Sequence, residues 1–120
     1  MKSILKLEEA AMFLLCVFVL VVLEAHRWVY LLLVLGPDIS MIGYLGGKKF
    51  GAACYNSFHH KGIAVLIFAV GVVISDYQGE ILNIIGIILF GHSSMDRMFG
   101  YGLKYSQGFK FTHLGEIGKK

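Results

Sequence analysis

Four long apolar runs dominate this sequence and restrict what it can fold into. They cover residues 10–23, 28–47, 62–75 and 81–95; Asp38 interrupts the second and His92 lies in the fourth. Of the 120 residues, 57% are hydrophobic and only 16% are charged, unlike a soluble domain. We therefore expect an all-α membrane protein with a single domain, residues 1–120. Four short transmembrane helices are predicted at about 5–25, 28–47, 55–75 and 80–97, with a glycine- and aromatic-rich tail, 98–120, folded on the cytoplasmic face.

Two other interpretations of these runs are weaker. Three runs are shorter than the roughly 20 residues of a spanning helix, as a soluble helical bundle would allow. Such a bundle needs polar residues on its outward faces, however, and stretches such as MFLLCVFVLVVL offer almost none. A signal peptide would explain Lys2 and Lys6 ahead of the first run. Against it, Glu8 and Glu9 follow them, and the rest of the chain remains strongly apolar.

Basic residues predict the orientation in the membrane. If four helices span it, the N-terminus, the segment between the second and third helices and the tail share one side. That side carries Lys2, Lys6, Lys48, Lys49, Lys61, Arg97, Lys104, Lys110, Lys119 and Lys120, and the other side carries only Arg27. The positive-inside rule then places both termini in the cytoplasm. Topology and contact with lipid headgroups explain the net charge of +3, so membrane lipid is the expected partner and nucleic acid is not.

Ionisable side chains are costly inside a membrane, so those near the apolar runs are candidate functional residues. Asp38, His59, His92 and Asp96 all lie toward the cytoplasmic side of the predicted helices. His92 and Asp96 are one helical turn apart and therefore point the same way. Imidazole and carboxylate groups are common ligands of zinc, iron and manganese. We predict that these four residues bind one divalent metal ion.

A metal ion at this depth would lower the pKa of a bound water and prepare it to attack a lipid ester, amide or phosphoester. The sequence therefore predicts a metal-dependent hydrolase acting on a lipid-like substrate. Glu8 and His113 are candidates for the catalytic general base or for a further ligand. Contacts with the substrate or its headgroup are predicted for Tyr44, Tyr55, Asn56, Arg97 and Lys104.

The same cluster has two alternative explanations. It could be a structural network, with Asp38 pairing with Arg97, in a non-catalytic scaffold or partner-binding protein. It could also line a path for protons or ions, although the outer halves of the predicted helices lack matching polar residues unless the protein forms a homo-oligomer. Cys16 and Cys54 match no zinc or redox spacing, and we expect both to be reduced packing residues.

Five motifs in this chain resemble a known family. They are LEEAAMF, GPDISMIGYLGG, the pair YN with His59 three residues later, GHSSMDRMFGYGLKY and GFKFTHLG. Together they resemble a bacterial family of small integral-membrane proteins catalogued as domain of unknown function 4260, over about residues 5–115. The resemblance implies a four-helix protein of the bacterial inner membrane and supplies no activity. Matching positions are Glu8, Pro37, Asp38, Ser40, Gly43, Tyr44, Tyr55, Asn56, His59, His92, Asp96, Arg97, Gly100, Tyr101, Gly102, Lys104, Thr112 and His113. Gly62 stands where the family often has a proline, which implies a straighter start to the third helix.

Overall fold

The protein is mostly helical, as the sequence predicts. A computed structural model describes residues 1–119. The elements follow in the order α1 (Lys2–Val22), α2 (Arg27–Leu35), the 3-10 helix η1 (Gly36–Gly46), α3 (Lys48–His59), α4 (Lys61–Ile74), α5 (Tyr77–Met98), β1 (Phe111–Thr112) and β2 (Gly115–Glu116).

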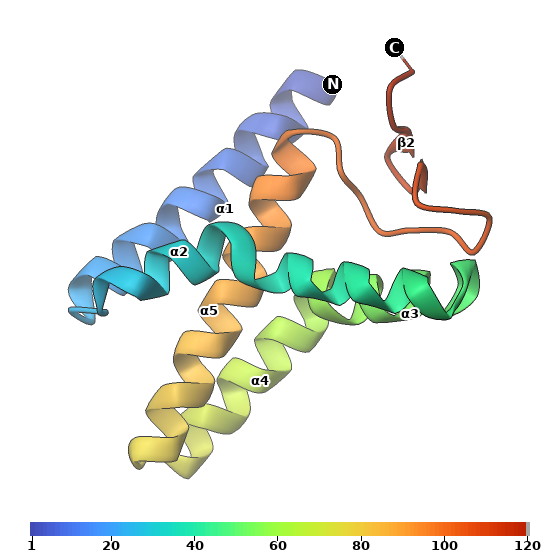
Figure 1. Cartoon of the computed structure of the whole chain (residues 1–120). Helices are drawn as coiled ribbons and strands as arrows, with labels where there is room; N and C mark the ends of the chain where they lie inside the picture. Colours follow the sequence, from blue (N-terminus) through green and yellow to red (C-terminus); the bar gives the residue numbers. More distant parts are fainter. Residues whose placement is uncertain (120) are drawn as a thin grey trace.

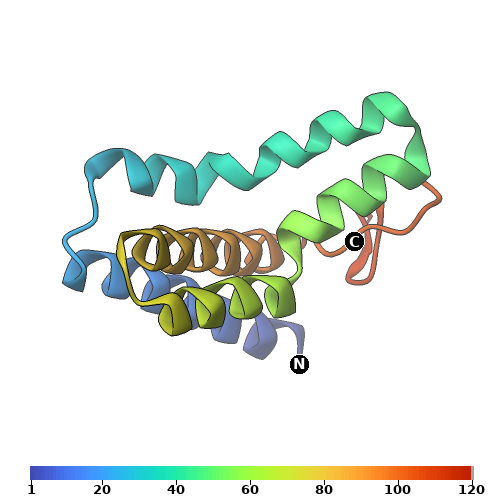
Figure 2. The same ribbon diagram turned by 90° about the horizontal axis from the view of Figure 1, so that it is seen from below.

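Helix α5 is the centre of the fold, and α1 and α4 pack along it (Figure 1). Helix α2 continues into η1 as one long rod on the other side of α5, and α3 returns antiparallel beside η1 (Figure 2). The apolar core lies where α1, α2 and α5 meet, and it consists of Cys16, Leu20, Val29, Leu33, Ile87 and Ile88. Cys16 and Cys54 are both free thiols, in agreement with the sequence.

Proline has no backbone N–H to donate and interrupts an α-helix, and Pro37 lies two residues after the end of α2 at Leu35. The rod instead continues as a 3-10 helix of 11 residues, which begins at Gly36. Within it, the Ser40 hydroxyl donates a hydrogen bond of 2.7 Å to the Pro37 carbonyl. This change of helix type places Asp38 beside α5, one residue after the proline.

A sharp turn and a close glycine contact return the chain along η1. Gly47 has φ +110°, a backbone conformation that favours glycine, and it joins η1 to α3. A Cβ atom at Gly51 would lie only 2.7 Å from the Tyr44 Cα. Only glycine therefore lets α3 pack this closely on η1, and this packing brings the end of α3 toward Asp38.

Four separate membrane spans are not confirmed. Within residues 1–119, the rod Arg27–Gly46 is the one helix long and apolar enough to cross a membrane. Helices α3 and α4 reach this standard only together, as a pair bent by 49°. The third span was predicted at about 55–75, whereas the helical segment begins at Lys48 and divides at His60. Charged residues in the first half of α1 and polar residues in α5 dilute those two apolar stretches.

The tail folds back on the helices, as predicted from its aromatic content. Strands β1 and β2 pair antiparallel, with Thr112 opposite Gly115, and a bridge joins Lys104 to Thr112. The side chain of Asn56 on α3 fixes this tail by two hydrogen bonds to the backbone of Lys104, at 2.8 and 2.6 Å. The tail therefore lies against α3, next to the residues predicted to bind metal.

Candidate metal centre

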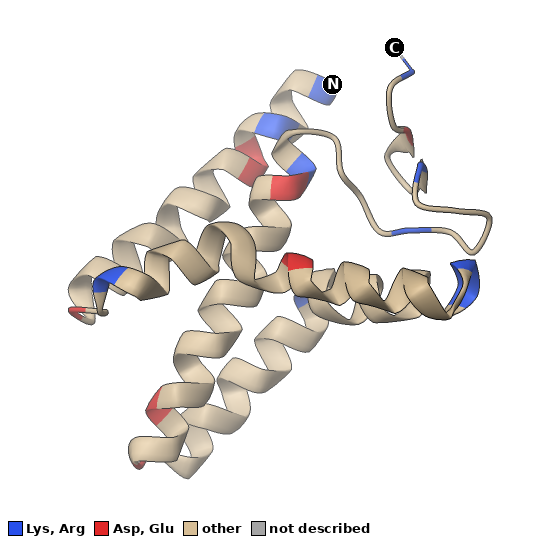
Figure 3. Cartoon of the chain, viewed as in Figure 1, with Lys and Arg blue, Asp and Glu red and all other residues tan. Residues whose placement is uncertain are grey.

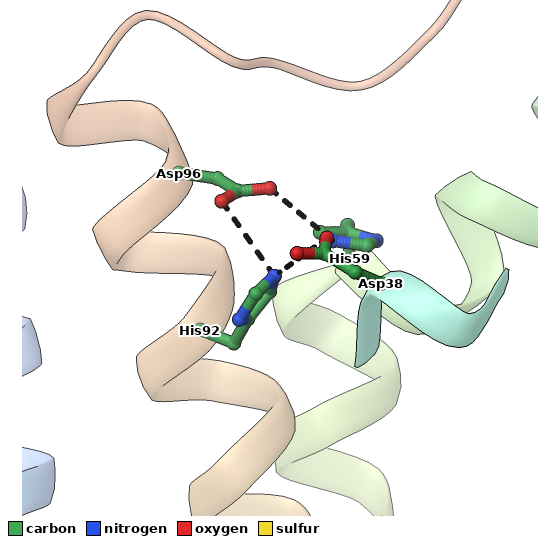
Figure 4. Close-up of side chains that lie close together, drawn as sticks. All are labelled: Asp38, His59, His92 and Asp96. Atoms are coloured by element: carbon green, nitrogen blue, oxygen red, sulfur yellow. Dashed lines mark hydrogen bonds and ion pairs between the residues drawn. The ribbon is translucent and has the colours of Figure 1, made fainter. Parts of the chain in front are cut away.

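Three elements bring the four predicted metal ligands together (Figure 4). Asp38 comes from η1, His59 is the last residue of α3, and His92 and Asp96 lie one turn apart on α5. One candidate ligand atom from each residue can be chosen so that all four lie within 4.8 Å of one another. This spacing fits a single ion, because ligand atoms around zinc lie about 2.0–2.2 Å from the metal.

Both imidazole rings turn the same nitrogen toward the two carboxylates. His92 Nε2 lies 3.0 Å from Asp38 Oδ1 and 3.6 Å from Asp96 Oδ1. His59 Nε2 lies 3.2 Å from Asp96 Oδ2 and 3.5 Å from Asp38 Oδ1. Each Nε2 therefore faces both carboxylates, so the four side chains surround one point.

The other nitrogen of each ring is held by the backbone. His59 Nδ1 lies 2.8 Å from the Tyr55 carbonyl oxygen, and His92 Nδ1 lies 2.9 Å from the Leu33 carbonyl oxygen. A carbonyl oxygen only accepts hydrogen bonds, so each Nδ1 carries the proton and donates it. In the neutral ring, Nε2 is then left with a lone pair directed at the carboxylates.

Lone pairs and carboxylate oxygens that face one another repel unless a cation lies between them. The His59 Nε2 is buried and has no hydrogen-bond partner. The side chains of His59 and His92 are 3% and 0% exposed, so charging both rings without solvent would be costly. One divalent ion would neutralise both carboxylates while the two imidazoles remain neutral. The donor set thus fits a divalent metal.

Neighbouring side chains hold the ligands in place. The Tyr55 hydroxyl donates a 2.8 Å hydrogen bond to Asp96 Oδ2, and its ring stacks on the His59 ring with 3.8 Å between centroids. The Ser93 hydroxyl donates to the His59 carbonyl at 2.7 Å. Contacts of this kind fix the orientation of metal ligands and strengthen binding. The Asp38 side chain is 40% exposed, so the site is open on the side formed by η1.

Comparison with known families matches residues 2–117 to the family described as domain of unknown function DUF4260. The chain belongs to this family. The match covers nearly the whole chain and confirms the resemblance inferred from the five motifs. No curated protein and no solved structure matches the chain. The DUF4260 description assigns no activity, so only the geometry of the site points to a function.

The other residues predicted for this DUF4260 site have different surroundings. Glu8 is exposed on α1, and neither it nor His113 belongs to the group of four. The N–H of Leu103 donates to His113 Nδ1 at 2.8 Å, and loss of solvation together with nearby Arg97 lowers the pKa of His113. His113 therefore has a structural contact in the tail. Its catalytic role and that of Glu8 stay predictions.

Of the predicted substrate-binding residues, Tyr55, Asn56 and Lys104 lie where the tail meets α3. Asn56 binds the tail backbone, and the Tyr44 hydroxyl is buried without a hydrogen-bond partner. Arg97 lies in the last turn of α5, beyond Asp96. Contacts of these residues with a substrate stay predictions.

Lysine 104 is a buried cation in an aromatic cage. Its residue is 4% exposed, and its Nζ has no hydrogen-bond partner. The Nζ lies 3.9 Å from the ring centroid of Phe109, 4.7 Å from that of Tyr55 and 5.9 Å from that of Tyr101. Such rings stabilise a cation through their negative faces. Burial nevertheless lowers the pKa of Lys104 to about 8, against the opposing charges of Asp96 and Asp38.

Several contributors to the site were missed from the sequence. The carbonyl groups of Leu33 and Tyr55 orient the histidines, but every residue carries a carbonyl, so the sequence gives no signal for them. Phe109 was missed because its role depends on how the tail folds back. Ser93 had a usable signal, since it directly follows His92, a predicted ligand.

Replacing Tyr55 with phenylalanine tests how the ligands are held. Tyr55→Phe keeps the ring that stacks on His59 and removes the hydrogen bond to Asp96. We expect zinc affinity, measured by competition with a chelating dye, to fall roughly 10- to 100-fold. Tyr105→Phe is the matched control, because the Tyr105 side chain is exposed. Equal zinc affinity in the two variants would show that the Tyr55 hydroxyl does not support the site.

The buried Lys104 predicts a pH dependence of stability. Its pKa is about 8 in the folded protein, below the roughly 10.4 of an unfolded lysine. Between these values the unfolded chain binds more protons, so the contribution of Lys104 to stability rises with pH. From pH 7.5 to 9.5, the melting temperature of wild type in detergent should rise relative to that of Lys104→Met. Lys110→Met, which replaces an exposed lysine, should keep the wild-type dependence. A constant difference between wild type and Lys104→Met contradicts the assignment.

Proposed function

We propose that this protein is a membrane-embedded metalloprotein that hydrolyses a lipid-like substrate. The observation that carries the proposal is the arrangement of His59 and His92. Each ring donates its Nδ1 proton to a backbone carbonyl and turns its Nε2 toward Asp38 and Asp96. Two imidazoles and two carboxylates suit zinc, iron or manganese.

Hydrolysis is the chemistry that this donor set best supports. A divalent ion held by the four residues would polarise a substrate oxygen and activate water at neutral pH. Asp38 is the most exposed of the four side chains, so substrate would approach from its side. Tyr55 keeps Asp96 fixed through its hydrogen bond, which limits reorganisation of the site during the reaction. Burial of both histidines keeps bulk water from the inner half of the site.

Membrane placement is supported by the outer surface of the helices. Large apolar side chains are exposed on α1, η1 and α4, among them Leu14, Phe18, Leu45 and Val73 at 63%, 63%, 89% and 83%. Such extensive apolar exposure is unusual for a soluble monomer. Together with the rod Arg27–Gly46, these surfaces favour insertion into a bilayer and a substrate that is itself lipid-like.

Charge placement supports a cytoplasmic position for the metal centre. The one charged residue in the loop joining α4 to α5 is Asp76, whereas Lys and Arg gather around the N-terminus, the turn between η1 and α3, the start of α4, the end of α5 and the tail (Figure 3). Arg27, in the first turn of α2, is the exception. By the positive-inside rule, this distribution favours cytoplasmic termini in a bacterial inner membrane.

A non-catalytic scaffold is the alternative that the geometry also allows. The four His–Asp distances of 3.0–3.6 Å fit ion pairs if both rings are protonated. The network would then hold η1, α3 and α5 together without a metal. Loss of one partner would leave a buried charge unpaired and would destabilise the protein.

Metal content separates these two functions. Protein purified without chelators should contain close to one equivalent of zinc, iron or manganese by elemental analysis, and His92→Ala and Asp96→Ala should lose it. His26→Ala is the matched control, because His26 is an exposed histidine outside the group of four, and it should retain the metal. Well-folded wild type without metal, together with a lower melting temperature in His92→Ala, would support the scaffold instead.

The same preparations test the reaction. Wild type and His26→Ala should release product from micellar phospholipid, and a chelator should stop the release. Metal-loaded protein that hydrolyses neither ester, amide nor phosphoester lipids would refute the hydrolase while leaving the metal centre intact.

A further inference from the structure

An apolar groove runs along the surface formed by α1, α4 and α5. Its walls include Leu15 and Val19 of α1, Val65 and Phe68 of α4, and Ile87 and Phe90 of α5. Helices α1 and α4 each pack on α5, and the groove lies between them, on the side of α5 away from the rod of α2 and η1 (Figure 2). Every lining residue is apolar or small, so the groove offers no partner to a polar ligand.

The volume of the groove, about 270 Å³, sets the size of its occupant. A dry apolar cavity of about 150 Å³ in a protein holds one benzene molecule, so this groove holds on the order of ten carbon atoms. That is part of a single acyl chain and too little for two chains. Left empty, the groove would deprive its walls of dispersion contacts, which favours filling by a flexible hydrocarbon.

An ion pair between two of its helices lies beside Phe90, at one end of the groove. Lys61, the first residue of α4, pairs with Glu9 of α1, and both side chains are only 16% exposed. The Lys61 Nζ also lies 5.0 Å from the ring centroid of Phe90, which lines the groove. The Lys61 ammonium therefore lies at the polar end of an otherwise apolar groove.

Lys61 retains capacity to bind an anion. Its ammonium has three N–H donors; one serves Glu9 and another reaches only the Met12 sulfur, at 3.6 Å. A thioether is a weak acceptor, so a phosphate oxygen would replace it favourably. Basic residues between helices at the cytoplasmic side commonly bind lipid headgroups in this way.

From these observations we propose that the groove binds one acyl chain of a membrane phospholipid, with its phosphate at Lys61. Lys61 is two residues from His59, so their Cα atoms are at most roughly 7.6 Å apart. The bound lipid would thus hold its polar end near the end of α3, but on the side of α5 away from the open, η1 side of the metal centre, so we assign it as a lipid held by the fold and not as the substrate. The inference rests on the membrane placement proposed above, and lipid binding itself needs no metal.

Filling the groove with a larger side chain tests the proposal. Val65→Trp places an indole in the groove, and Val72→Trp is its control on the same helix, two turns later and equally exposed at 54% against 55%. Native mass spectrometry of protein released from phosphatidylglycerol nanodiscs should show one retained lipid in wild type and Val72→Trp. Retention should fall about tenfold or more in Val65→Trp, since displacing two methylene groups costs that much affinity.

A second pair of variants tests the groove independently, in case Val65→Trp fails to fold. Leu15→Trp fills the groove from α1, and Leu14→Trp, at a neighbouring exposed position outside the lining, is its control. Metal content measured on the same samples should be equal in all four variants, so a defective metal centre and a defective groove give different results. Equal lipid retention in the groove variants and their controls overturns the proposal. It is also overturned if wild type and the controls form a dimer without lipid and the groove variants do not, because a second copy of the chain would then occupy the groove.

The headgroup part of the proposal has its own test. The double variant Lys61→Met, Glu9→Gln removes the cation without leaving its carboxylate partner charged. Binding of phosphatidylglycerol should weaken, whereas binding of diacylglycerol, which lacks a phosphate, should stay at the wild-type level. Equal weakening of both lipids, or of neither, would show that Lys61 does not recognise the phosphate.

Discussion

Two hydrogen bonds from imidazole rings to backbone carbonyls fix the geometry of the candidate metal centre. The carbonyls of Leu33 and Tyr55 accept the Nδ1 protons of His92 and His59, and this leaves both Nε2 atoms directed at Asp38 and Asp96. Four acceptor groups around one point repel one another unless a cation lies among them or the rings are protonated. A divalent metal supplies the required charge without protonating two buried rings, so the orientation of the rings favours a metal centre over a neutral polar network.

The fold serves this centre by bringing distant segments to α5. The turn at Gly47 and the close packing of Gly51 return α3 along η1, and the extended backbone at His60 ends α3 so that His59 meets α5. The tail then covers α3, where Asn56 holds Lys104 by its backbone. The groove between α1 and α4 lies on the other side of α5, with its polar end two residues from His59. The groove and the candidate metal centre are therefore close along the chain but open on different sides of α5.

Much of the ligand set could be predicted from the sequence, because helical spacing places His92 and Asp96 on one face and Asp38 is an acid within an apolar run. The path of the backbone could not be predicted from the sequence. Pro37 changes the helix type without breaking the rod, and the predicted third span divides at His60. Histidine is not a helix breaker, so the residue at this position gives no signal for the extended backbone found there. The hydrogen bonds from the two Nδ1 atoms to backbone carbonyls could not be predicted either, because every residue has a carbonyl group.

The coordination of a bound ion tests the metal centre most directly. The X-ray absorption spectrum of zinc-loaded protein should show two imidazole nitrogens and carboxylate oxygens, all at about 2.0–2.2 Å, with no sulfur. Zinc bound through sulfur at about 2.3 Å, or through oxygen alone without imidazole, would contradict a centre built from His59, His92, Asp38 and Asp96.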